Sequence, residues 1–254
     1  MSDILTDLEA GVLTITLNRL EKKNAFTAAM YLACADAIQA GVDNPAVRVV
    51  LLQGHETVFS AGNDIADFMD NPPTGPHAPV YRLLRAAADC PKPLLAAVCG
   101  PAVGIGTTLL LHCDLVYAGD NAAFAMPFVN LGLCPEAGAS LLVPQLMGYQ
   151  RAAEALLLGD PIMAEAALEV GLVNRIVPPT EARTVAQMQA RKLASKPQDA
   201  LCTTKRLMRQ GDAQRIRNQL DAEAHELARL LQAPAAREAF AAFAEKRRPD
   251  FSGL

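Results

Sequence analysis

The chain contains 254 residues, of which 51% are hydrophobic and 20% are charged. This length and composition allow a sizeable core, either as one large domain or as one domain with an appendage, and they argue against a disordered or fibrous protein. The net charge of -4 gives no global attraction for nucleic acid or an anionic membrane, so an anionic ligand would need a local basic patch.

Up to Met147 the sequence predicts an alternation of strands and helices, because period-two apolar runs alternate with stretches at helical spacing. A unit of strand, strand and helix recurs without clear repetition of the sequence. Thr27 is the expected cap of the first helix, and residues 71–79 are expected to form a mobile loop because Pro and Gly are dense there. The predicted strands cover residues 12–17, 47–52, 94–98, 114–118 and 122–126. The predicted helices cover residues 27–40 and 80–88, and two further helices are expected to end at Leu111 and Met147.

From about Ala152 the pattern becomes mostly helical, and only residues 174–177 resemble a strand. From Pro197 to the end the chain is predicted to be all helical, with apolar residues at helical spacing. Such a tail has little core of its own, so we expect it to pack on a partner subunit or to fold back over the main domain. We therefore divide the chain into a core, residues 1–196, and a helical oligomerisation region, residues 197–254.

The cysteines and the hydropathy indicate where the protein works. None of the six cysteines forms a CxxC pair and most lie in apolar stretches, so we interpret them as buried thiols of a reducing compartment and expect a cytoplasmic location. The N-terminus begins no signal peptide, and the longest apolar run, residues 94–111, is interrupted by glycines and cannot span a membrane. The four histidines are scattered without metal-ligand spacing, so no metal site is expected.

Two glycine turns, Phe59–Asp64 and Gly100–Gly106, each stand where a strand is predicted to lead into a helix. Turns of this kind leave unpaired backbone N–H groups facing outward, and two of them on adjacent layers could form an oxyanion hole. Taken singly, a turn of this kind is more often an ordinary glycine-rich turn, and it is the pair in this order that carries information. The second turn lacks the Gly-Lys-Ser/Thr of a P-loop and the third glycine of a dinucleotide fingerprint.

Glu136 lies at another turn into a helix and has apolar neighbours along the chain, such as Phe128, Leu133 and Leu141. One interpretation is a solvent-facing glutamate that interacts favourably with a helix dipole. The other is a general base in an apolar pocket, with a pKa raised by desolvation. The residues alone leave both interpretations open.

Taken in order, these motifs resemble the crotonase (enoyl-CoA hydratase/isomerase) superfamily over essentially the whole chain. Within it, the segments SAGND, GPAVGIG and PEAGAS look most like the monofunctional peroxisomal-type Δ3,Δ2-enoyl-CoA isomerases. The motifs that carry the resemblance are Asn18-Arg19 with Asn24-Ala25, Phe59 to Asp64, Pro91-Lys92-Pro93, Gly100 to Gly106, Cys113-Asp114, Pro135 to Gly138, and Glu245-Lys246-Arg247.

The resemblance implies an α/β fold, a crotonase-type spiral of repeated ββα units followed by a C-terminal helical trimerisation region. It implies an oxyanion hole from the N–H groups of Asn63 and Ile105, with Glu136 as the single acid/base. The positions where hydratases carry two glutamates hold Thr108 and Phe128. The CoA and substrate contacts that it implies are Arg19, Lys22, Lys23, Ser60, Ala61, Gly62, Asp64, Gly104 and Lys246, the last reaching a neighbouring subunit's CoA.

The leading hypothesis is therefore an enoyl-CoA isomerase that transfers a proton between C2 and C4 of an acyl-CoA thioester. The alternatives are an enoyl-CoA hydratase or another enolate-forming crotonase reaction, and, in a different class, a non-catalytic CoA-binding protein of the same fold. We expect no cofactor beyond the coenzyme A of the substrate, no nucleic-acid or membrane partner, and a homotrimer or dimer of trimers.

Overall fold

Six strands form the main sheet of the computed structural model, which describes residues 2–75 and 77–254. Pro76, in the expected loop 71–79, lies outside the described residues, and the mobility of that loop stays a prediction. The strand order is β1-β2-β3-β4-β6-β9; β1 runs antiparallel to β2, and all other neighbours are parallel. These strands are β1 (Ile4–Glu9), β2 (Val12–Leu17), β3 (Val49–Gln53), β4 (Leu94–Val98), β6 (Leu115–Gly119) and β9 (Arg175–Val177).

A second, three-stranded sheet has the order β5-β7-β8, with β5 (Pro101–Val103) parallel to β7 (Ala123–Ala125) and β8 (Ile162–Met163) antiparallel to β7. Consecutive strands therefore enter different sheets: β4 is followed by β5 and helix α4 (Ile105–Thr108), and β6 by β7 and helix α5 (Ala139–Met147). This repeated ββα path places the second glycine turn, Gly100–Gly106, where the chain passes from the main sheet through β5 into α4.

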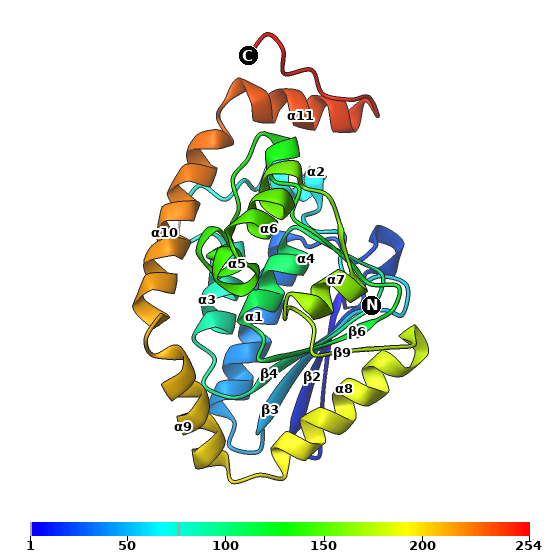
Figure 1. Cartoon of the computed structure of the whole chain (residues 1–254), viewed down its shortest axis with the longest axis vertical. Helices are drawn as coiled ribbons and strands as arrows, with labels where there is room; N and C mark the ends of the chain where they lie inside the picture. The colour runs from blue at the N-terminus through cyan, green and yellow to red at the C-terminus, as the bar shows by residue number, and fades with distance from the viewer. Residues whose placement is uncertain (1, 76) are drawn as a thin grey trace.

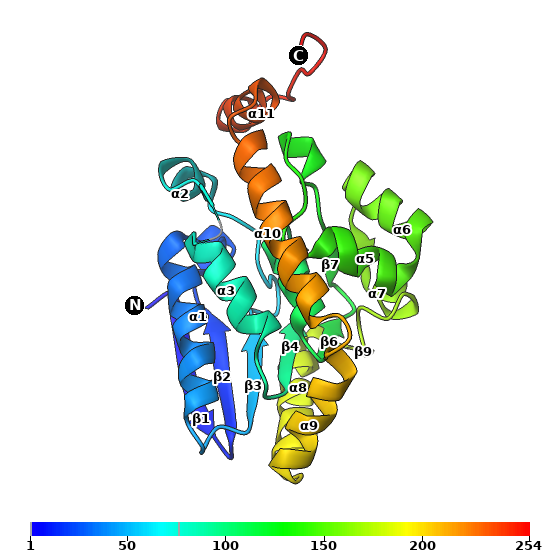
Figure 2. The same cartoon turned by 90° about the vertical axis from the view of Figure 1, so that its left-hand side faces the viewer.

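Helices cover both faces of the main sheet, as its parallel strands require. On one face lie α1 (Ala28–Asp43) and α3 (Pro79–Ala88), and on the other lies α8 (Pro179–Ala194), as Figures 1 and 2 show. The buried side of α8 consists of alanines such as Ala186 and Ala190, which lets the helix lie close against Val49 and Leu95. Thr27 caps α1 as expected, because its hydroxyl accepts from the Met30 N–H at 3.3 Å.

The tail consists of α9 (Gln198–Arg209), α10 (Ala213–Leu230) and α11 (Pro234–Ala244), and it folds back over the main body. Figure 2 shows α10 running alongside α3, and it also contacts α5. Leu220 and Ala224 of α10 are buried in the main core, and the nearly buried Lys205 of α9 donates to Asp114 at 2.7 Å. Whether the chain divides at residues 196 and 197 stays a prediction.

Some boundaries differ from the sequence-based expectation for identifiable reasons. Strands β1, β5 and β8 were not expected: of the six residues of β1 only Ile4 is buried, β5 has three residues within the expected second glycine turn, and β8 has two residues. The helix expected to end at Leu111 is only α4, which passes into a 3-10 turn at Leu109–His112. The other short helices are α2 (Ile65–Asp70), α6 (Tyr149–Ala153) and α7 (Ala164–Glu169).

Two further expectations concern the cysteines and the membrane. All six cysteines are free, but the expected burial holds fully only for Cys34, Cys90 and Cys99, while the other three are partly exposed. None of the helices in the described part of the chain has the length and hydropathy that a bilayer span requires.

Candidate active site

The first glycine turn is anchored from both sides by hydrogen bonds. The Ser60 hydroxyl donates to the Asn24 carbonyl at 2.9 Å and accepts from the Gly62 N–H at 3.1 Å. Gly62 has φ +90°, a left-handed conformation that glycine adopts without strain, and a Cβ there would lie 2.9 Å from the Val103 carbonyl oxygen. Only glycine therefore allows the first turn to approach the second this closely.

The second glycine turn lies directly beside the first. Ser60 and Ala102 form a parallel bridge, and the Val103 N–H donates to the Ser60 carbonyl at 2.9 Å. Gly104, with φ +53° and ψ -119°, then turns the chain into α4, whose first residue is Ile105. The two turns are thus joined by backbone hydrogen bonds, as an oxyanion hole with one donor from each turn would require.

The backbone N–H groups of Asn63 and Ile105 make no hydrogen bond to any residue that the structure describes. For Ile105 the reason is its place at the start of α4, where the first N–H groups have no intrahelical acceptor. For Asn63, the bridge to Phe26 uses the Gly62 carbonyl and the Asp64 N–H, and leaves the N–H of Asn63 unused. Two unpaired donors on neighbouring turns can hold one carbonyl oxygen as negative charge develops on it.

Glu136 is 2% exposed, which excludes the solvent-facing interpretation. Its Oε1 atom has no hydrogen-bond partner among the described residues, an unusual state for a buried carboxyl group. Burial raises the pKa of Glu136 to about 8, the nearby charge of Glu223 adds to the rise, and the Thr108 hydroxyl opposes it. A buried, unpaired carboxyl group with this pKa can take up and release a proton near neutral pH.

A cavity of about 590 Å³ connects these elements. Its walls are largely apolar, with Phe68 from α2, Leu227 from α10 and Phe240 from α11. Seven of the residues expected in the site line it: Lys22, Ala61, Gly62, Asn63, Asp64, Gly104 and Glu136. Phe128 also lines the cavity and Thr108 is buried beside Glu136, so neither of the two hydratase positions supplies a carboxylate.

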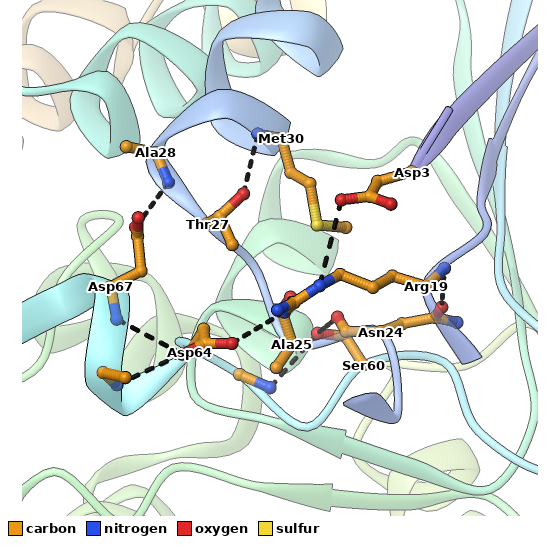
Figure 3. A network of polar contacts seen from close by, with 12 residues as sticks. Asp3, Arg19, Asn24, Ala25, Thr27, Ala28, Met30, Ser60, Asp64 and Asp67 are labelled. Atoms are coloured by element: carbon orange, nitrogen blue, oxygen red, sulfur yellow. Dashed lines mark hydrogen bonds and ion pairs between the residues drawn. The ribbon is translucent and has the colours of Figure 1, made fainter. Parts of the chain in front are cut away.

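Arg19, one of the three basic residues expected to bind CoA, does not line this cavity. Its guanidinium donates to the Asp64 carboxylate at 2.7 Å and to the Ala25 carbonyl at 3.0 Å, as Figure 3 shows. Burial raises the pKa of Asp64, but hydrogen bonds from Arg19 and from the backbone N–H groups of Asp67 and Ala66 outweigh it and hold the pKa below its usual value. This pair joins the basic turn to the start of α2.

The other expected residues outside the cavity lining are Lys23, Ser60, Ile105 and Lys246. Ser60 and Ile105 are fully buried, so Ser60 shapes the turn, and the oxyanion role expected of Ile105 stays a prediction that rests on its unpaired backbone N–H. Lys246 is an exposed residue just after α11. The CoA contacts expected of Lys23 and Lys246 stay predictions.

Sequence analysis missed three residues close to Glu136. The Tyr31 hydroxyl donates to the Asn63 side-chain oxygen, and the buried Tyr81 hydroxyl has no partner among the described residues. Burial raises the pKa of both tyrosines and the charge of Glu136 adds to the rise. The third residue is Glu223 of α10, whose carboxylate accepts from the Gly138 N–H at 2.6 Å. Glu223 could have been noticed in the sequence as a charged residue on the apolar stripe of a helix.

The chain thus combines an α/β fold, two unpaired backbone donors on adjoining turns and a buried carboxyl group that lines an apolar cavity. The profile of the enoyl-CoA hydratase/isomerase family matches residues 7–253, and the chain belongs to that family, the crotonase superfamily of acyl-CoA enzymes.

Individual relatives place the chain among both isomerases and hydratases. It is 38% identical to the 1,2-epoxyphenylacetyl-CoA isomerase of Escherichia coli K12, over all of this chain and 99% of that protein. It is 36% identical to human enoyl-CoA delta isomerase 2, over 82% of this chain and 54% of the longer human protein. It is 32% identical to the 2,3-dehydroadipyl-CoA hydratase of Escherichia coli K12 over the full length of both.

Solved structures share the whole fold, which confirms the expected crotonase-type architecture. Pseudomonas aeruginosa OdaA superposes with a TM-score of 0.93 at 43% identity, covering 96% of this chain and 99% of the other. An enoyl-CoA hydratase/isomerase from Pseudoalteromonas atlantica T6c superposes with a TM-score of 0.94 at 36% identity, covering 99% of this chain and 100% of the other.

Proposed function

We propose that the protein is a Δ3,Δ2-enoyl-CoA isomerase with Glu136 as its single acid/base. The observation that carries the proposal is the state of the carboxylates in the cavity. Among the described residues that line it, only Asp64 and Glu136 are acidic, and Asp64 is engaged by Arg19 and by the first N–H groups of α2. Glu136 alone is buried with an unpaired oxygen.

The reaction needs one base that serves two carbons. Glu136 removes a proton from C2 of a 3-enoyl thioester, and the electrons move onto the thioester oxygen as a dienolate forms. The N–H groups of Asn63 and Ile105 donate to that oxygen, and the protonated Glu136 then returns the proton to C4. A pKa near 8 suits this role, because the same group must accept and release the proton within one turnover.

The composition of the cavity wall disfavours hydration. Adding water to a 2-enoyl thioester needs one group to activate the water and another to move the second proton. Phe128 lines the same cavity as Glu136, and a phenyl ring offers no group that could activate a water molecule. Thr108 supplies a hydroxyl, which lies 3.2 Å from the Gly104 carbonyl oxygen, and no carboxylate. A single carboxyl group in such surroundings favours proton transfer over addition of water.

We also propose that the enzyme needs no cofactor beyond the CoA of its substrate, that it assembles as a homotrimer or a dimer of trimers, and that it works in the cytoplasm. The assembly proposal is supported by exposed apolar side chains such as Tyr149, Leu157 and Leu158. Analytical ultracentrifugation at micromolar concentration tests it, and a monomeric mass would contradict it.

The decisive experiment assays the purified protein with 3-enoyl-CoA and with 2-enoyl-CoA in parallel. We expect isomerisation to exceed hydration at least about a hundred-fold, which is the lower end of what one missing acid/base group costs. Glu136→Gln is expected to remove the isomerisation while leaving the affinity for acyl-CoA nearly unchanged. Comparable rates for the two reactions, or turnover that survives the substitution, would contradict the proposal.

A further inference from the structure

The backbone that carries Glu136 has an unusual conformation. Ala137 and Gly138 follow it with φ values of +66° and +71°, so two successive residues lie in the left-handed region. For an alanine this conformation is unfavourable and persists only where surrounding contacts enforce it. One such contact is the hydrogen bond between the Ala137 carbonyl and the buried His112 Nε2, at 2.9 Å.

The stronger contact comes from the C-terminal tail. Glu223 of α10 accepts hydrogen bonds from the Gly138 N–H at 2.6 Å and from the Ser140 N–H at 2.9 Å, and its carboxylate also accepts from the Ser140 hydroxyl. These groups are the first turn of α5, where glycine at the N-cap position offers no side chain of its own. A residue 83 positions further along the chain thus supplies the cap that the local sequence lacks.

Glu223 is only 5% exposed, and Gln219 on the same helix donates to the Ser140 hydroxyl at 2.7 Å. A buried charge is unfavourable unless it is hydrogen-bonded, so this arrangement fixes α10 against α5 and both of them around the Glu136 turn. The same carboxylate is near enough to Glu136 to raise its pKa further.

We propose that Glu223 is a positioning residue for the isomerisation. It holds the Ala137–Gly138 turn so that the carboxyl group of Glu136 faces the acyl cavity, and its charge favours the protonated form of Glu136 that must deliver the proton to C4. The proposal rests on the proposed function of Glu136.

The titratable groups that surround Glu136 come from several elements. Tyr31 lies on α1, Tyr81 on α3, Cys134 precedes the turn, and Glu223 lies on α10. The two tyrosines and the cysteine have raised pKa values because of burial and stay neutral near neutral pH. Burial raises the pKa of Glu223 too, and hydrogen bonds from Ser140 and Gly138 oppose this rise by favouring its ionised form. Glu223 is therefore the acidic group that a single substitution can remove next to Glu136.

The test compares Glu223→Gln with Glu223→Asp, and uses Glu226→Gln as the matched control, because Glu226 lies on the same helix, is exposed and pairs with Arg229. Glu223→Gln removes the charge and one acceptor. We expect its kcat for 3-enoyl-CoA to fall about ten- to a hundred-fold, as for a displaced catalytic group, with little change in KM. The pKa of Glu136, measured by carbon-13 NMR, should fall. Glu226→Gln should match the wild type in both measurements.

Glu223→Asp separates geometry from charge. The shorter side chain keeps the charge but cannot reach both N–H groups, so kcat should stay low while the pKa of Glu136 remains near that of the wild type. If Glu223→Gln does not fold, Glu223→Asp and Ser140→Ala carry the test, because each weakens the cap and retains the charge.

Wild-type kcat together with an unchanged pKa of Glu136 in Glu223→Gln would overturn the proposal. So would variants that reduce only the folded fraction, with kcat per folded site unchanged, because Glu223 would then be merely structural. The NMR comparison needs no turnover, so it tests Glu223 even if the wild-type protein fails to isomerise 3-enoyl-CoA, a result that would contradict only the proposed function.

Discussion

A buried base with an unpaired carboxyl oxygen should reduce the stability of the fold, and this cost depends on pH in a way that can be measured. Glu136 is nearly inaccessible, and its Oε1 atom is unpaired within the described structure. In the unfolded chain the same carboxyl group is hydrated and ionises normally. Glu136→Gln removes the ionisable group and keeps its shape, so we expect the variant to be more stable than the wild type at alkaline pH.

The size and sign of this change in stability follow from the pKa values of Glu136 in the folded and unfolded states. Burial raises the pKa of Glu136 from 4.5 to about 8. Below about pH 4.5 the group is protonated in both states and costs nothing, whereas between the two values the folded state binds more protons than the unfolded one. The stability of the wild type therefore falls as pH rises, by about 1.4 kcal/mol per pH unit, and the total loss is about 4 to 5 kcal/mol once the pH exceeds about 8.

The assay is chemical denaturation of wild type and Glu136→Gln at one protein concentration, at intervals from about pH 5 to about pH 9. The difference between their free energies of unfolding should grow in favour of the variant up to about pH 8 and then level off. His112 titrates as well, since burial lowers its pKa to about 4, but it is common to both proteins and cancels in the difference. Glu226→Gln, at an exposed position, should show no such growth.

The dependence on pH is the diagnostic quantity. A buried glutamine amide brings its own unsatisfied groups, but their effect on stability is the same at every pH. A difference that stays constant from acid to alkaline pH would mean that Glu136 ionises normally in the folded protein. The reasoning from burial would then be refuted, and with it the reason to regard Glu136 as tuned for proton transfer.

Three other outcomes are expected. The kcat/KM for isomerisation should rise with pH through about 8, because the base acts in its ionised form; a profile that is already flat at pH 6 would contradict this. Lys22→Gln should raise KM for acyl-CoA several-fold and leave kcat unchanged, because it removes about one exposed charge contact with the ligand. Lys23→Gln should change neither quantity, because Lys23 does not line the cavity. Arg19→Ala should lower the free energy of unfolding by about 2 kcal/mol, because it leaves the Asp64 carboxylate without its partner; unchanged denaturation midpoints would exclude a structural role.

Much of the fold was predictable because its central strands carry uninterrupted or alternating apolar runs. The bounds of β2 and β4 coincide with those predicted from residues 12–17 and 94–98. β1 was not predictable in this way, because it lies at the sheet edge and buries only one of its side chains. Its pairing with β2 comes from the tight turn at Ala10 and Gly11, both with positive φ, rather than from an apolar pattern.

The glycine turns and Glu136 are local features of the sequence, but their roles were predicted from the resemblance to a family and not from the residues alone. The different roles of the basic residues could not be predicted, since Arg19, Lys22 and Lys23 are neighbours in one polar turn. Only the tertiary structure shows that Asp64 engages Arg19 while Lys22 lines the cavity. Whether a charged side chain pairs within the protein or binds a ligand depends on what the fold brings next to it. Arg19 and Asp64 are 45 positions apart, and nothing in a single sequence indicates that they pair.

The C-terminal helices also make contacts near Glu136 that could not be predicted from the sequence. A proton-transfer site needs groups that are unfavourable on their own: an unpaired carboxyl oxygen on Glu136, a left-handed alanine at 137 and unused N–H groups on two turns. Such features persist only where other contacts compensate for them. Here the compensation comes from Glu223, on a helix that the sequence suggested for oligomerisation. The helices after residue 197 therefore complete the active site as well as extend the surface, because without α10 nothing in the described structure would cap the helix that follows Glu136.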